Sequence, residues 1–102
     1  MISLSIRRTL CDPQSEVDRV PGISIPDWDE VEGLQLLRSV DYYEDAAFNY
    51  HLLGLVLAEV ERWRQYEVGR GDPESRMATI DRIHDALSSA LESRRYAVFL
   101  AL

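Results

Sequence analysis

The chain has 102 residues, of which 46% are hydrophobic and 28% charged, and its formal net charge is −7. This length accommodates one domain with one core, and the composition excludes a disordered chain. We expect a single domain over residues 1–102, small enough for a partner or a second copy to add useful stability.

Signals for export or membrane insertion are missing from the sequence. Residues 1–8 lack the apolar run of a signal peptide, and no stretch approaches about 20 apolar residues. We therefore expect a cytoplasmic protein that does not enter a membrane. Cys11 is the only cysteine, which excludes an internal disulfide and a cysteine-rich zinc site.

The first segment alternates between apolar and polar residues. Ile2, Leu4 and Ile6 fall on one side of an extended chain, so residues 2–8 are predicted to form a half-buried strand. Residues 9–26 contain three prolines and one glycine. This composition predicts a loop with at most one helical turn.

A helix is predicted to begin at Asp27. Glu30 follows three positions later, as in a capping box, and an apolar residue then recurs at every third position. The helix is expected to end near Ser39. Its apolar stripe comprises Trp28, Val31, Leu34, Leu37 and Val40.

A long central helix is the strongest element that the sequence predicts. Asp41 and Glu44 repeat the capping pattern, and no proline interrupts the chain from there to about Glu67. Between Leu52 and Val60 the segment is apolar almost all round, which favours a helix covered on several sides. Two of its leucines are expected in the core: Leu53 and Leu57.

The last helix is predicted from Pro73, with Asp72 as its N-cap, and it is amphipathic. Residues 96–102 form either its last two turns or a strand beside residues 2–8, and we favour the strand. The predicted fold class is mainly α with a minor β contribution. It has a three-helix core with a long central helix, an N-terminal strand and the C-terminal strand.

Charge is distributed unevenly along the chain. Residues 12–45 carry ten acidic residues against two arginines, a net charge of −8, so the remaining residues are nearly neutral. A negative field of this size repels nucleic acid and favours basic surfaces. We therefore expect a partner protein with a basic surface and no direct contact with nucleic acid.

The acidic residues around Trp28 resemble a docking segment, in which an aromatic anchor is surrounded by carboxylates. The simpler interpretation is that Trp28 belongs to the core and the acids complement the helix dipole. Tyr42 and Tyr43 are adjacent on a predicted helix, so one of them must point outward. The predicted partner-binding residues are Asp27, Trp28, Asp29, Glu30, Glu32, Tyr42, Glu44 and Asp45.

A metal site was considered on the two histidines. His51 follows Glu44 by seven residues, and His84 follows Asp81 by three, so each histidine shares a helix face with a carboxylate. Ordinary hydrogen-bonded histidines explain the same pattern, and we expect no metal and no other cofactor.

Catalytic motifs are also missing, because the sequence has no nucleophile elbow and no phosphate-binding glycine loop. Cys11 could pair with a histidine, but its position directly after a strand favours a small buried thiol. We therefore do not expect an enzyme.

The main functional hypothesis is a small binding protein, such as an inhibitor, an antitoxin, an immunity protein or a phage-encoded antagonist. One alternative is a structural or accessory subunit that acts as an obligate homodimer, which the apolar C-terminus and the long helix favour. The other alternative is a small metal-dependent enzyme.

Overall fold

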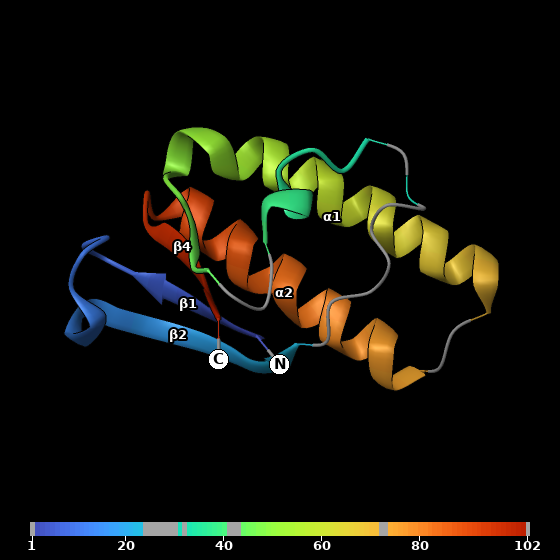
Figure 1. The fold of residues 1–102 in the computed structure, drawn as a ribbon, viewed down its shortest axis with the longest axis horizontal. Coiled ribbons are helices and arrows are strands. Elements are labelled where there is room, and N and C mark those ends of the chain that lie inside the picture. The colour runs from blue at the N-terminus through green and yellow to red at the C-terminus, as the bar shows by residue number, and fades with distance from the viewer. Residues whose placement is uncertain (1, 24–30, 32, 41–43, 72–73, 102) are drawn as a thin grey trace.

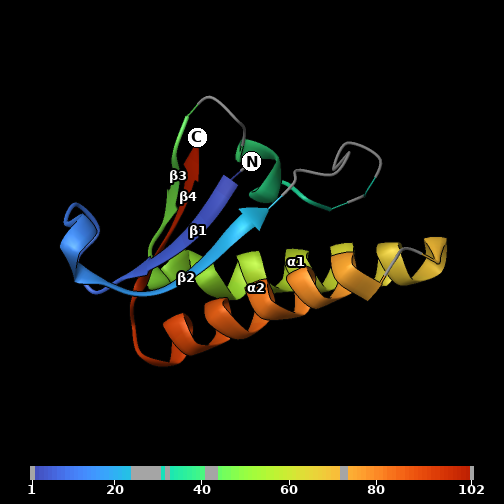
Figure 2. The same cartoon turned by 90° about the horizontal axis from the view of Figure 1, so that it is seen from below.

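The computed structural model describes residues 2–23, 31, 33–40, 44–71 and 74–101, without the side chain of Ser75. Along the chain the regular elements are β1 (Ile2–Arg7), the 3-10 turn η1 (Pro13–Ser15), β2 (Glu16–Ile23), the 3-10 turn η3 (Leu37–Ser39), β3 (Ala46–Phe48), α1 (Tyr50–Arg70), α2 (Glu74–Glu92) and β4 (Tyr96–Ala101). The strands form an antiparallel sheet in the order β2-β1-β4-β3. Helices α1 and α2 lie side by side against one face of this sheet (Figures 1 and 2).

The predicted fold class, mainly α with a three-helix core, is wrong. Within the described residues two long helices and a four-stranded sheet form an α+β fold. The helix expected over residues 27–39 is replaced, in its described part, by the short turn η3. Gly33 has a φ of +83°, in the left-handed region, which interrupts an α-helix. The described part of the apolar stripe is nevertheless buried: Val31, Leu34, Leu37 and Val40.

Strand β2, with eight residues, lies inside the segment 9–26 that we expected to be a loop. Pro21 and Gly22 lie inside it, and β2 is an edge strand, where the missing amide hydrogen of proline is tolerated. Gly22 has a φ of +68°, and the pairing with β1 shifts register between Ile2 and Leu4. This is the geometry of a β-bulge, which lets a strand continue past residues that usually end one.

The central helix begins at Tyr50 rather than at Asp41, which lies outside the described residues. Asn49 is its N-cap, and the Asn49 side chain accepts a backbone hydrogen bond from the first turn at 3.2 Å. The residues before it form β3, which pairs with β4 at the second edge of the sheet. Gly71, with a φ of 71°, caps the other end of the helix.

Three other predictions are confirmed. Strand β1 falls within residues 2–8, and β4 is a strand paired along β1. The helix predicted from Pro73 is present as α2, although Pro73 itself lies outside the described residues. No helix in the described ranges has the length and the apolar character needed to cross a bilayer.

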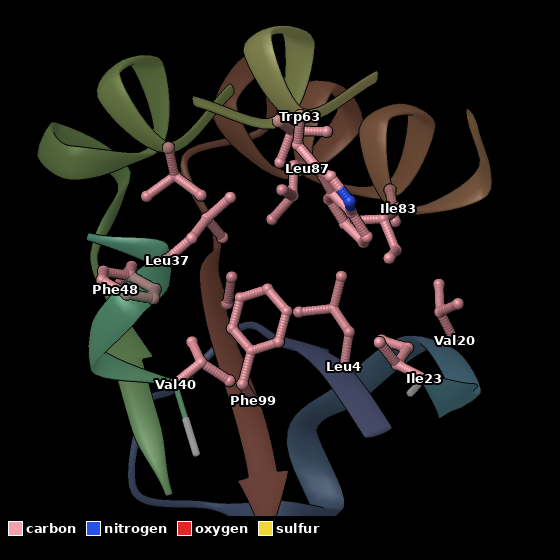
Figure 3. Packing of buried hydrophobic residues seen from close by; sticks show 14 of the residues in the cluster. Leu4, Val20, Ile23, Leu37, Val40, Phe48, Trp63, Ile83, Leu87 and Phe99 are labelled. Atoms are coloured by element: carbon pink, nitrogen blue, oxygen red, sulfur yellow. The ribbon is translucent and has the colours of Figure 1, made fainter. Parts of the chain in front are cut away.

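The core lies between the two helices and the sheet. Leu53 is fully buried, as predicted, whereas Leu57 is only partly buried. Leu55 is 59% exposed, so one side of α1 is uncovered although this part of the helix is apolar almost all round. Figure 3 shows side chains from both layers meeting in this core: Leu4, Phe99, Trp63 and Leu87.

Polar side chains of β1 form a network on the face of the sheet away from the core. The Ser5 hydroxyl donates to the Glu16 carboxylate at 2.7 Å, and Arg7 Nε donates to the Ser5 oxygen at 3.1 Å. Arg19 donates two hydrogen bonds of 2.8 Å to Glu16. Because these partners cover Ser5 and Arg7, all of β1 is buried rather than one side of it.

Candidate functional site

The Glu59 carboxylate holds the segment before η3 against α1. Its Oε1 atom accepts hydrogen bonds from the amides of Leu36 and Leu37, both at 2.9 Å, and Oε2 accepts from Leu36 at 3.1 Å. Glu59 is only 5% exposed, so these amides replace the water that the carboxylate loses on burial. The carboxylate therefore fixes the path of a segment that has little regular structure.

A cleft of about 350 Å³ opens between this segment and α1. Arg62 crosses it, and Arg62 Nη1 donates to the carbonyl oxygen of Gly33 at 3.2 Å. A Cβ on Gly33 would lie 3.0 Å from the same Nη1 atom, so the absence of a side chain lets the arginine lie close to the backbone. The lining comprises Gly33, Gln35, Leu36, Leu55, Ala58, Glu59 and Arg62.

The chemistry of this cleft suits binding. Leu55 is more than half exposed, and Leu52, three residues before it on α1, is 36% exposed. Neighbouring exposed leucines beside a cleft make an apolar contact area, which is more informative than a single exposed leucine. Both Glu59 oxygens already accept hydrogen bonds from backbone amides, so this carboxylate is a structural group.

Comparison of the chain with protein-family models, with curated proteins and with solved structures finds no match.

Most of the predicted partner-binding residues lie outside the described ranges: Asp27, Trp28, Asp29, Glu30, Glu32 and Tyr42. Glu44 and Asp45 are described, and both are exposed. The Asp45 carboxylate accepts a hydrogen bond from the Ala101 amide at 2.8 Å, so it also holds the end of β4. The described part of the acidic segment that touches the cleft comprises Gly33, Gln35 and Leu36.

The described acidic residues of segment 12–45 do not form one patch. Asp18 lies on β2, at one edge of the sheet, whereas Glu44 and Asp45 precede β3, at the other edge. Glu16 is paired with Arg19, whose hydrogen bonds lower the pKa of Glu16 to about 2. The described acidic residues of the segment therefore lie at opposite edges of the sheet, and none of them lines the cleft.

The structure does not gather the four possible metal ligands into one group: Glu44, His51, Asp81 and His84. Asp81 accepts a hydrogen bond of 2.7 Å from Arg64, and His84 lies 3.9 Å from Glu61. Among the described residues no three side chains of the metal-binding types form a group. Cys11, expected to be buried, is exposed in the connection between β1 and β2.

Sequence reasoning missed two buried carboxylates, Glu59 and Glu67. The Glu67 Oε1 atom accepts a hydrogen bond of 3.1 Å from the Trp63 indole, and Oε2 lies 3.7 Å from the Arg76 guanidinium. Helical spacing indicated the burial of both glutamates. Glu59 is three residues after the buried Val56, and Glu67 is four residues after the buried Trp63. Residues at these spacings share the helix face that enters the core.

Proposed function

We propose that this chain is a small acidic protein-binding protein that occupies a basic surface of another protein, as an inhibitor, an antitoxin, an immunity protein or a phage-encoded antagonist does. The contact surface combines the cleft over α1 with the acidic residues of segment 27–45. One observation carries the proposal: this segment supplies one wall of the cleft, and the exposed Leu55 supplies the other.

The cleft and the acidic residues together have the composition of a protein–protein interface. Such interfaces have an apolar centre that excludes water and a polar rim that sets specificity. Leu36, Leu55 and Ala58 supply apolar lining, and Arg62 adds a polar group. The chain on either side of the described wall carries Asp29, Glu30, Glu32, Asp41 and Glu44.

The negative charge of the segment indicates that the partner's contact surface is positively charged. Five of its carboxylates fall within residues 29–44 alone, against one arginine, Arg38. A surface with this balance attracts a basic protein over several ångströms and repels nucleic acid, which is itself a polyanion.

Binding accounts for the cleft better than catalysis does. Among the described residues, its lining contains no serine, cysteine or histidine, and the carboxylate of Glu59 accepts hydrogen bonds from backbone amides with both oxygens. A general base must instead reach the proton that it abstracts. We therefore propose a binding role without a chemical step.

A pair of matched substitutions on α1 tests the cleft. Once a partner has been captured from the native host and purified, Leu55→Ser should weaken its affinity by about tenfold, because a buried leucine at an interface contributes more than 1 kcal/mol. Val68→Ser is the control, since Val68 is exposed to a similar extent, 56%, on the same helix but does not line the cleft. Affinity is measured by isothermal titration calorimetry.

Equal affinities for Leu55→Ser and the unmodified protein would overturn the proposed surface. Light scattering of each variant without partner tests the homodimer alternative. If the chain self-associates and Leu55→Ser alone abolishes this, the cleft is a contact between two copies and the accessory-subunit alternative replaces the proposal.

A further inference from the structure

The pairing of β1 with β4 brings arginines that are distant in sequence to one end of the sheet. Arg7, the last residue of β1, lies opposite Tyr96, the first residue of β4. Arg8 follows β1 directly, while Arg94 and Arg95 directly precede β4. We call Arg8, Arg94 and Arg95 together the arginine end. It lies where α2 leads into β4, beside the end of β1 (Figure 2).

None of the three arginines forms an ion pair with another residue that the structure describes. Arg8 and Arg94 are exposed, and Arg95 is half-buried. The chain has 18 acidic residues for 11 arginines, so unpaired cations gathered at one place are not forced by composition. The nearest acid along the chain is Glu92, which is exposed and also outside the described ion pairs.

Arg94 occupies a backbone position that favours glycine. Its φ is 55°, and among the described residues it is the non-glycine residue with a positive φ. The Arg94 amide donates to the Leu91 carbonyl at 3.2 Å and the Arg95 amide to the Ala90 carbonyl at 2.8 Å, which is the Schellman ending of a helix. The same chain uses glycine, Gly71, at the corresponding left-handed position after α1.

We propose that the arginine end is a second interaction surface, which binds a carboxylate-rich segment of a partner protein. Guanidinium groups bind carboxylates through paired hydrogen bonds, and three of them without an ion-pair partner among the described residues are suited to a run of acidic side chains. Arg94 adds backbone strain at this position, with a φ of 55°, and strained positions of this kind are common at functional sites.

The class of partner follows from the charge of the whole chain. A net charge of −7 repels a long polyanion such as DNA or RNA at distances beyond the reach of three arginines. A short acidic stretch of a protein concentrates its charge where the arginines are. This surface does not depend on the proposed function, because none of its residues lines the cleft.

A simpler role for Arg94 and Arg95 is to complement the dipole at the C-terminal end of α2. The two explanations predict opposite results for Arg94→Gly. If the side chain is retained for binding, glycine relieves the left-handed strain, so the melting temperature is unchanged or rises while binding weakens. If the side chain serves the dipole, the melting temperature falls.

Binding is tested with a fluorescein-labelled octaglutamate peptide at low ionic strength, followed by fluorescence anisotropy. The full chain should bind it saturably, and the triple variant R8Q/R94Q/R95Q should bind about tenfold more weakly or not at all. A control with the same loss of charge is R64Q/R70Q/R82Q, which should retain binding. A labelled single-stranded DNA of equal charge is the second probe.

Four outcomes overturn the proposal. Three of them concern binding: no saturable binding of octaglutamate, equal weakening by the two triple variants, and tighter binding of the DNA than of the peptide. A fall in the melting temperature of Arg94→Gly with unchanged peptide binding also overturns it, in favour of the dipole. Because the peptide assay needs no knowledge of the partner at the cleft, its failure leaves the proposed function standing.

Discussion

At the scale of single residues, Glu16 links two strands through its hydrogen bonds with Ser5 and Arg19. These bonds, from Arg19 above all, outweigh the opposing effect of burial and lower the pKa of Glu16 from 4.5 to about 2. The same pair raises the pKa of Arg19, which stays charged throughout the accessible range. Because the folded protein binds this proton less readily than the unfolded chain does, ionised Glu16 stabilises the fold.

The sign of this shift sets a pH window. The stabilisation is fully present above pH 4.5 and is lost as the pH falls through the folded pKa near 2. Glu16→Gln should therefore be less stable than the unmodified protein at neutral pH, and the difference should shrink on acidification. Urea unfolding at a series of pH values measures both curves.

The matched control for Glu16 is Asp85→Asn on the exposed side of α2. Its unfolding free energy should remain within about 0.5 kcal/mol of that of the unmodified protein, as for most exposed substitutions. Parallel stability curves for Glu16→Gln and the unmodified protein across the acid range would contradict the role assigned to the pair.

At the scale of elements, the Glu59 carboxylate fixes the segment that forms a wall of the cleft. Glu59→Ala removes the acceptor for the Leu36 and Leu37 amides in a buried setting, and each unsatisfied amide costs about 1 to 3 kcal/mol. We expect a loss of about 2 to 4 kcal/mol in unfolding free energy. Urea denaturation measures it, and hydrogen exchange should show faster exchange of both amides.

Gln65→Ala on the same helix is the control for Glu59→Ala. Gln65 is exposed, so its substitution should change the unfolding free energy by no more than about 0.5 kcal/mol. If Glu59→Ala is as mild as this control, the carboxylate does not hold the segment and the cleft does not depend on it.

At the scale of the whole molecule, the acidic residues should control how fast a partner associates. Replacing Asp29, Glu30 and Glu32 with Asn or Gln preserves side-chain size and removes three charges. Association should slow and depend less on salt, because charges at an interface rim act mainly on the association rate. Stopped-flow or surface-plasmon kinetics over a range of salt concentrations measure this.

The control for the acidic triple variant neutralises Glu74, Asp85 and Glu92, three exposed acids on α2. Glu67 is unsuitable for this purpose because it is fully buried and accepts a hydrogen bond from Trp63. Equal effects of the two triple variants would show that association responds to total charge and not to the segment beside the cleft.

Periodicity in the sequence determined the elements whose pattern is set locally. The alternation in residues 2–8 predicted β1, the amphipathic stripe after Pro73 predicted α2, and the apolar end of the chain favoured β4. Spacing of apolar residues also identified buried positions such as Leu34 and Leu37, even where the predicted helix is not formed. Burial of a periodic apolar face is favourable whichever element forms it, so the spacing identified these positions, although it did not identify Leu55 as exposed.

Tertiary structure alone decided where the chain pairs with itself. Pro21 and Gly22 indicated a loop because their local preferences oppose a strand, yet an edge position and a bulge accommodate both. The short strand β3 has no pattern of its own and exists because β4 supplies its hydrogen bonds. The contact of Glu59 with residues 36 and 37 and the pairing of Arg7 with Tyr96 are likewise non-local, so a pattern along the sequence does not encode either of them.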